Sequence, residues 1–406
     1  LAIEDVLGTK ITLDTVLKNL GSPEPTFTPL NYSLASANIE PIIVKLGLPL
    51  PQWHLFKEQP MQATGTLQGS LSEVEINTSA TLKDMLFSYK GTLAQKEFFT
   101  FDGHGVLKST NFSKIVNNLG AHWEKYKNTS ALNCSGDLQG DTQNWTLRAT
   151  QCILGTAKYT GDFSLQQKEG LSVISGKIKT TELDLANVLD IQSNKTGHEA
   201  NILYADDFMA HPSFNRDLYR FDAYRRIAAD IDLTADTVLL NGASLQNVSA
   251  HFKNDANRLY LDNLKFTYLQ APFSGNIQID YTQQPKIKGK LQGENIKLSR
   301  IGGKIYTLSS ESGQAQIDFI SSAVSMEDFM KNLNGSVNFT VTDLKVNGWD
   351  FAAIEQDLQK RVYSKGVFQT VRDNLQRGQT DFASGQGKML FQNGIWNFQD
   401  TTCQND

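Results

Sequence analysis

The sequence predicts a mainly β protein, with short amphipathic helices between the strands and a longer helix near the C-terminus. The main observation is a regular alternation of apolar and polar residues in many short segments. In residues 229–235, for example, Ile231 and Leu233 fall on one side of a strand and Asp232 falls on the other. Because this period-two pattern buries only one face, it indicates an antiparallel sheet that is wet on one side. A compact β-sandwich would show the same alternation.

The alternating segments define one candidate apolar surface. If the strands form one long curved sheet with an open side, as a gutter does, alternate positions would line a continuous apolar channel. A methylene group gains about 0.8 kcal/mol on leaving water, so such a channel would hold lipid without any catalytic residue. Periodicity alone does not distinguish an open channel from a filled core. The residues expected to line the channel are Ile231, Leu233, Leu259, Leu261, Leu264, Phe266, Phe273, Ile277, Ile279, Val337, Phe339 and Val341.

Short helical runs recur between the predicted strands. Apolar residues at helical spacing occur in five runs, and in all but the fourth a glycine follows the last apolar residue, as is common where a helix stops. Short amphipathic helices also resemble one another by chance, and the uneven intervals exclude a strict solenoid repeat. The five runs are residues 13–21, 39–47, 112–120, 183–189 and 296–302.

A longer helix is predicted in the C-terminal third. Phe351 and Ile354 begin a helical spacing directly after Asp350, whose side chain is placed to cap the helix. We expect helix over residues 350–377, with an interruption at residues 364–366. One face of this helix is apolar, so we expect it to pack against the sheet.

The chain of 406 residues exceeds the usual size of a single core, so we expect several parts or one elongated part. Residues 196–228 break the strand pattern with a polar stretch and charges of both signs. A solvated connection is the favoured interpretation, and a charged binding site is the alternative. The predicted parts are an N-terminal β part at 1–195, the connecting segment at 196–228 and a C-terminal β part at 229–406.

Composition and charge exclude several classes of protein. The formal net charge is -5 with 20% charged residues and no basic run, so nucleic acid is not an expected partner. No window approaches the roughly 18 apolar residues of a membrane-spanning helix. No signal peptide opens the sequence, so we expect any membrane anchor or export signal to lie outside this chain.

The sequence shows no catalytic or metal-binding constellation. Its 6 histidines are scattered, and none has a second histidine or a cysteine at the spacing that a metal site requires. The nucleophile-elbow, phosphate-loop and zinc-protease motifs are absent from it as well. We therefore expect a protein that is not an enzyme and that holds no cofactor and no metal ion.

Two of the 3 cysteines fall in neighbouring predicted strands. Cys134 and Cys152 lie on either side of a predicted turn at residues 140–144, and a hairpin centred on Gln143 would bring them face to face. A disulfide at this place requires an oxidising compartment, which favours secretion or the periplasm. Two small buried thiols are the alternative. Cys403 has no candidate partner.

Two short motifs follow one another near the C-terminus. The first is the strand formed by Leu333, Asn334, Gly335, Ser336 and Val337, and the second is the helix start Gly348, Trp349, Asp350 and Phe351. This succession resembles the C-terminal signature of the AsmA family of bacterial envelope proteins. Residues 230–252 and 258–281 are similar to the consecutive strands of that family, and the first 200 residues match it in style only.

The resemblance implies a fold and a place in the cell. AsmA-like proteins are anchored in the bacterial inner membrane and extend into the periplasm, and they are similar to bridge-like lipid-transfer proteins with taco-shaped sheets. The fold expected on this basis is a long curved antiparallel sheet with a groove. The expected ligand is phospholipid, held by its acyl chains, and the expected compartment is the periplasm.

Other functions stay open at this point. The AsmA family is implicated in outer-membrane integrity and in assembly of outer-membrane proteins, so such proteins, or other envelope proteins, are further expected partners. The chain would then act as a structural or assembly factor that binds them at an exposed strand edge. A carbohydrate-active or adhesive β-protein would need clustered exposed aromatic residues, whereas the 5 tryptophans are spread singly.

Overall fold

The computed structural model describes 23 strands, all within one hydrogen-bonded sheet, together with two helices. The described residues are 2–6, 9–14, 17–18, 26–38, 41, 60–70, 72–82, 84–95, 99–112, 130–141, 143–168, 171–185, 227–240, 243–255, 257–281, 284–302, 307–323, 325–359, 369, 371–372 and 378–405.

The strands of the first half precede residue 185. They are β1 (Ala2–Val6), β2 (Thr9–Asp14), β3 (Leu17–Lys18), β4 (Thr26–Ser36), β5 (Met61–Ser70), β6 (Glu73–Leu82), β7 (Met85–Gln95), β8 (Phe99–Ser109), β9 (Leu132–Asp141), β10 (Asn144–Leu154), β11 (Ala157–Lys168) and β12 (Leu171–Asp184).

The strands of the second half begin at residue 227. They are β13 (Ile227–Leu240), β14 (Ala243–Asn254), β15 (Arg258–Tyr268), β16 (Ala271–Asp280), β17 (Lys286–Gly293), β18 (Leu298–Gly302), β19 (Thr307–Ser310), β20 (Ser312–Ser322), β21 (Asn334–Asn347), β22 (Gln379–Gln392) and β23 (Ile395–Gln404). The helices are α5 (Met326–Lys331) and α6 (Phe351–Gln359).

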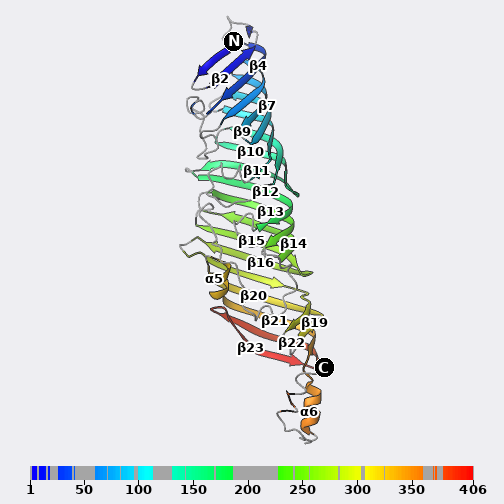
Figure 1. The fold of residues 1–406 in the computed structure, drawn as a ribbon. Coiled ribbons are helices and arrows are strands. Elements are labelled where there is room, and N and C mark those ends of the chain that lie inside the picture. Colours follow the sequence, from blue (N-terminus) through cyan, green and yellow to red (C-terminus); the bar gives the residue numbers. More distant parts are fainter. Residues whose placement is uncertain are drawn as a thin grey trace.

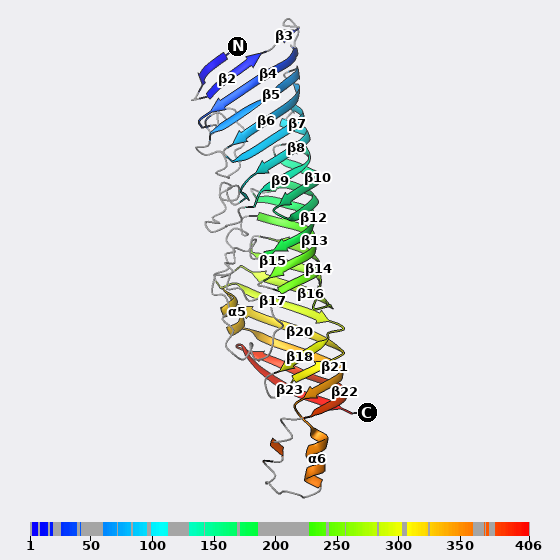
Figure 2. The same ribbon diagram turned by 45° about the vertical axis from the view of Figure 1, so that its right-hand side comes forward.

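Most strands pair antiparallel with the next strand in the chain. The exception in direction is the β12–β13 pair, which is parallel. β18 and β19 form a short hairpin beside the main path, and β20 returns to pair with β17. The sheet therefore extends as a long ladder from β1 near the N-terminus to β23 near the C-terminus (Figures 1 and 2).

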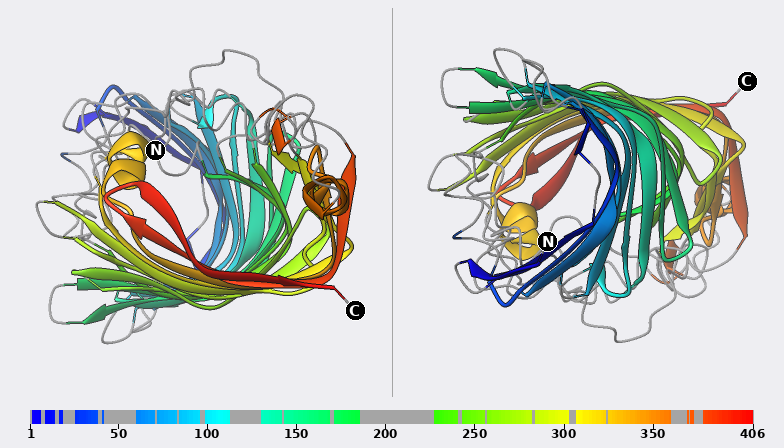
Figure 3. Two further views of the ribbon diagram at one scale, coloured as in Figure 1. Left: turned by 90° about the horizontal axis from the view of Figure 1, so that it is seen from below. Right: turned by 90° about the horizontal axis from the view of Figure 1, so that it is seen from above.

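The sheet is strongly curved and open along one side. Viewed along its length, it forms an arc that does not close into a barrel (Figure 3). The predicted class of fold, a mainly β protein with one long curved antiparallel sheet, is thereby confirmed. Buried apolar residues gather in separate clusters along the sheet, as expected when a single elongated layer replaces a central core.

β-Bulges keep one face apolar where simple alternation would fail. In β15 the pairing register shifts between Leu261 and Leu264, and Asn263 between them has a left-handed φ of 51°. Asparagine tolerates this conformation better than most residues. The extra residue places Leu261 and Leu264 in the same cluster, although they are three positions apart. In β10 the register shifts in the same way around Ala149, whose φ is 49°.

The apolar face is the concave one. α5 lies on the inner side of the curve, beside the strand β20 (Figure 3). Its Phe329 packs edge-on against Phe319, with ring centroids 6.0 Å apart, and joins the cluster that contains Val337. Because Phe329 reaches this cluster from inside the arc, the side chains of Phe319 and Val337 point into the arc as well.

Two of the predicted short helices are wrong where the structure describes them. β2 and β3 occupy the described residues of the run at 13–21, and β18 occupies most of the run at 296–302. Each run offers apolar residues over about two helical turns, and helices this short are marginal without packing. A neighbouring strand supplies backbone hydrogen bonds at once, so strand pairing prevails here.

The structure describes only single helical residues in the other predicted short helices. Pro41, Phe112 and Leu185, each within one of the three remaining runs, have helical backbone. Most of the runs at 39–47 and 112–120 lies outside the described residues, as does the end of the run at 183–189. Leu183 and Asp184, at the start of that last run, still belong to β12.

The start of the predicted C-terminal helix is confirmed. α6 begins at Phe351, and the Asp350 side chain accepts a hydrogen bond from the backbone N–H of Ala353, at 2.8 Å. The body of α6 projects beyond the end of the sheet in Figure 2, whereas the sequence predicts packing against it. Its first residue, Phe351, does contact the sheet, with its ring centroid 6.3 Å from that of Phe382 in β22. Residues 360–368, including the predicted interruption, lie outside the described residues.

The predicted connecting segment at 196–228 lies outside the described residues except for its last two. The strands on either side of it, β12 and β13, are hydrogen-bonded to each other from Ser172–Ile227 to Asp184–Leu239. The sheet is therefore continuous between the two halves. The division into parts at 1–195 and 229–406 stays a prediction.

Candidate functional site

Strand pairing places the predicted channel residues on one face of the sheet. Residues directly opposite each other in paired strands point to the same side, so a row of side chains can be followed from strand to strand. One row starts at Ile231 in β13 and continues through Phe252, Leu261 and Ile277 to Gly289 in β17. Gly289 is opposite Phe319 in β20, which ties this row to the concave side.

A second row runs beside the first. It links Phe266, Phe273, Gly293, Ala315 and Phe339 across β15 to β21. The rings of Phe266 and Phe273 are stacked, with centroids 5.2 Å apart and planes inclined by 8°. The other predicted residues share this face by the same registers: Leu233, Leu259, Leu264, Ile279, Val337 and Val341. Their contact with a lipid stays a prediction.

The concave face is not a filled core. Leu259, Leu264, Val337 and Val341 are buried. The remaining predicted residues, from Ile231 to Phe339, are only half-buried although they are large and apolar. Side chains of this kind normally find partners that cover them completely. The described residues therefore form an apolar trough, which we call the concave groove, whose floor is accessible.

The groove continues into the N-terminal half, where the sequence singled out no residue. The row of Ile231 extends backward to Gly176, Phe163, Leu147 and Leu138. The three large side chains among them are half-buried as well. The period-two alternation that identified the C-terminal groove residues is also present in these strands. The same pattern could therefore have identified the N-terminal groove residues.

The two cysteines lie in the floor of the groove. Cys134 is opposite Cys152, which confirms the predicted hairpin register, and their sulfur atoms are bonded at 2.13 Å rather than forming two separate thiols. The row continues to Leu107 on one side and to Tyr159 on the other. Burial raises the pKa of the Tyr159 phenol, while a hydrogen bond with Thr180 opposes this increase.

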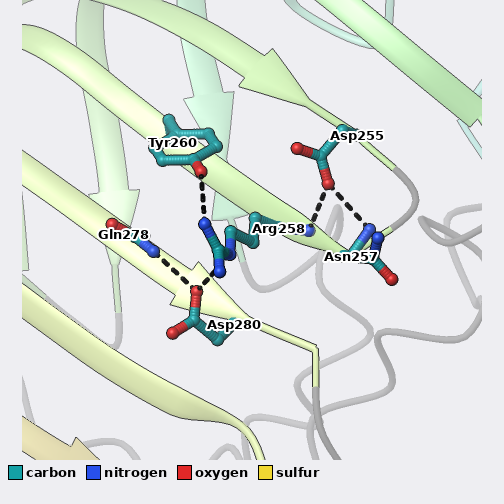
Figure 4. A network of polar contacts seen from close by, with 6 residues as sticks. All are labelled: Asp255, Asn257, Arg258, Tyr260, Gln278 and Asp280. Atoms are coloured by element: carbon teal, nitrogen blue, oxygen red, sulfur yellow. Dashed lines mark hydrogen bonds and ion pairs between the residues drawn. The ribbon is translucent and has the colours of Figure 1, made fainter.

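The convex face is polar and ordered by hydrogen bonds. In Figure 4, Nε of Arg258 lies 3.3 Å from an oxygen of Asp280, and its guanidinium donates to the hydroxyl of Tyr260 at 3.4 Å. Tyr260 also borders a shallow hollow of about 450 Å³. Lys290 and Asp318, 3.3 Å apart, line the same hollow. Charges of both signs thus lie on this side, together with Ile320, which is 47% exposed and lines the same hollow.

Two features are absent from the described residues: a cluster of metal ligands and a helix that could span a membrane. Nowhere in the described ranges do three histidine, cysteine, aspartate or glutamate side chains gather as metal ligands would. None of the described helices is long and apolar enough to cross a membrane. The groove is the principal feature to be explained.

An open curved β-sheet with an apolar concave face is the class of protein that these observations define. The family model of the AsmA family matches residues 50–401, and the chain belongs to this family. The resemblance seen in the C-terminal motifs is thus confirmed over most of the chain. AsmA proteins are associated with the cell envelope and are not a known enzyme family. Comparison with curated proteins and with solved structures gave no match.

Proposed function

We propose that this chain binds phospholipid, with the acyl chains in the concave groove and the head group at its open side. The observation that carries the proposal is a single row of side chains from Leu138 in β9 to Phe319 in β20. This row consists only of apolar residues and glycine across consecutive paired strands. Exposed apolar surface of this extent is uncommon in a soluble protein unless it binds something.

The energetics favour an acyl chain as the occupant. At about 0.8 kcal/mol per methylene, a chain of roughly 16 carbons leaving water would gain on the order of 10 kcal/mol. No directional polar partner is needed for this gain. A groove without catalytic residues is therefore sufficient for binding, and a lipid can move along it because each position offers a similar environment.

Membership of the AsmA family supports a setting in the bacterial envelope. We infer that the chain is a periplasmic segment of a protein that is anchored in the inner membrane by a part outside this chain. Its role would be lipid transport to the outer membrane, and thereby the integrity of that membrane. The bond between Cys134 and Cys152 supports an oxidising compartment such as the periplasm.

Native mass spectrometry of the purified chain tests this proposal, and the unaltered chain should carry phospholipid. Ile277→Asp places a carboxylate in the groove, and burying that charge against an acyl chain should lower bound lipid by about fivefold or more. Asn276→Asp is the matched control, because Asn276 is exposed beside it on the convex side. An unaltered chain without lipid, or equal lipid in both variants, would contradict the proposal.

A second candidate function rests on the edge strand β23. Its residues are exposed throughout, and among the described residues it pairs only with β22. Ile395 and Phe398 are 64% and 66% exposed, which is unusual for such large apolar side chains. An exposed edge of this kind accepts an added strand from another chain. The partner would be an outer-membrane protein before it folds.

Photo-crosslinking from the position of Phe398 separates the two functions. Labelling of an unfolded outer-membrane barrel protein in preference to phospholipid would favour the strand-edge function. Labelling of phospholipid alone would favour the groove function. Ser384, on the partner strand β22, provides a control position away from the free edge.

A further inference from the structure

Several glycines of the concave groove lie directly opposite a phenylalanine. Gly289 in β17 pairs with Phe319 in β20, and Gly387 in β22 pairs with Phe339 in β21. Since opposite residues share a face, each phenylalanine ring has a position without a side chain beside it. We call these the glycine–phenylalanine pairs.

The backbone does not require glycine at these positions. Neither Gly289 nor Gly387 has a left-handed φ, so other residues would fit the local conformation. Space is the reason for glycine instead. A Cβ atom at Gly289 would lie 2.6 Å from Cζ of Phe319, and one at Gly387 would lie 2.8 Å from Cζ of Phe339. Both distances are too short for two carbon atoms, so each ring lies across its glycine.

A third pair shows the same geometry in the second row, the row that also contains Phe339. Gly293 is opposite Phe273, and a Cβ atom there would lie 2.5 Å from Cε1 of that ring. Gly293 also lacks a left-handed φ. The three pairs lie on β16 to β22, so the arrangement repeats along this part of the groove rather than occurring once.

The direction of curvature makes this arrangement important. On the concave side of a curved sheet, side chains from neighbouring strands converge, so upright rings would fill the space that a ligand needs. A ring that lies across a glycine covers the backbone and adds only its own thickness to the floor. The result is an apolar surface with little height.

We propose that the glycine–phenylalanine pairs set the clearance of the groove, and that acyl chains run over this flat aromatic floor between β16 and β22. The inference rests on the proposed lipid-binding function and identifies the residues that keep the passage open. A β-branched side chain at Gly289 displaces the ring of Phe319 toward the lumen, where the acyl chain would lie. One substitution therefore closes the groove locally without introducing charge.

Photo-crosslinking to phospholipid measures this effect in the full chain. Benzoylphenylalanine replaces either Ile317, which is two residues from Phe319 on the same face, or Leu233, which lies further along the groove in β13. The probe is a vesicle of phosphatidylethanolamine and phosphatidylglycerol. Gly289→Val should reduce labelling at position 317 by about fivefold, in line with the cost of overpacking, and leave labelling at position 233 unchanged.

A compensating variant separates local closure from damage to the fold. Adding Phe319→Ala to Gly289→Val removes the displaced ring, so labelling at position 317 should return to within about twofold of the parent chain. Lys288→Val is the matched control, because Lys288 neighbours Gly289 in β17 and borders the convex hollow. It should leave labelling unchanged at both positions.

Two results would overturn the inference. One is unchanged labelling at position 317 in Gly289→Val, and the other is a loss that Phe319→Ala does not relieve. If the variants at Gly289 do not fold, Gly387→Val with and without Phe339→Ala repeats the test at β22. Both chains then also carry Thr401→Ala, because Oγ1 of Thr401 would lie 2.8 Å from a Cβ atom at position 387. Absence of labelling in the parent chain at both positions contradicts the lipid-binding function itself. Labelling at position 317 that is the same in the parent chain and in Gly289→Val contradicts only the role of the glycine–phenylalanine pairs.

Discussion

Ile277 and Gln278 are neighbours in β16, yet they belong to surfaces with opposite chemistry. Ile277 takes part in the apolar row of the concave groove, while the amide of Gln278 donates to Asp280 at 2.6 Å in the convex network of Figure 4. The concave face is held by packing, and the convex face by hydrogen bonds and ion pairs. The chemistry of each face therefore depends on the pairing register, which must be maintained across many strands for apolar side chains to stay on one side.

The two faces should also differ in how much each contact stabilises the fold. Burial of apolar surface contributes about 25 cal/mol per Å² wherever water is excluded. Exposed ion pairs contribute little, because water screens them and both side chains lose mobility. Changes to the concave side, or to the register that defines it, should therefore cost more stability than changes to the convex side.

The largest effect is expected when the register is disturbed. Deletion of Lys265, which follows the bulge in β15, makes Leu264 and Phe266 adjacent, so one of these two apolar side chains must turn toward the convex side; Leu264 is 7% exposed in the native structure. Exposing that side chain and bringing a polar residue into the groove in its place should lower the free energy of unfolding by about 3–6 kcal/mol, as measured by urea denaturation. Deletion of Asn263 is the control, because it removes only the extra residue of the bulge and leaves Leu261 and Leu264 on one face by simple alternation, and it should cost less than about 2 kcal/mol. Equal loss in both variants would contradict the role of the register.

An intermediate effect is expected from the covalent link in the floor of the groove. The disulfide between Cys134 and Cys152 joins residues 18 positions apart. Its removal should lower the free energy of unfolding by about 3 kcal/mol, because the unfolded chain regains the freedom of that loop. Thermal unfolding of Cys134→Ala/Cys152→Ala, beside the unaltered chain with and without dithiothreitol, measures this loss. If dithiothreitol destabilises the double variant as much as the unaltered chain, the loss of stability on reduction does not come from the disulfide.

The smallest effect is expected from the convex side of β9, where it faces β8. In β9, Asp137 lies 2.7 Å from Nδ1 of His104, and both side chains are more than half exposed, at 63% and 53%. His104→Gln should change the free energy of unfolding by less than about 1 kcal/mol, as judged by the same thermal unfolding. A loss comparable to that of the disulfide would mean that the convex network stabilises the fold more than exposure suggests.

Part of the groove could be predicted from the sequence because of one physical property of strands. Side chains alternate between faces with a period of two, so the alternation in β13 assigns Ile231 and Leu233 to one face without knowledge of the pairing. Sequence reasoning also placed Leu264 with Leu261, because both are apolar, but it did not foresee that a bulge at Asn263 makes this possible. A bulge depends on the partner strand, which local patterns do not reveal.

The errors have a related cause. The runs at 13–21 and 296–302 have apolar residues at helical spacing, yet pairing with β4 and β19 makes strands of their described parts. Nothing in the sequence indicates that the ring of Phe319 lies across Gly289. Their relationship appears only when β17 and β20, which are separated by the β18–β19 hairpin, are hydrogen-bonded.

The sequence by itself determined which side chains share a face within each regular stretch of strand, the absence of a recognisable catalytic motif, and the kinship of the C-terminal motifs with the AsmA family. Only the tertiary structure decided that the apolar face is the inside of an open arc and that its floor is left accessible. The physical reason is that period-two alternation is a property of each strand alone. Curvature, in contrast, accumulates from twist and bulges over many pairings between strands.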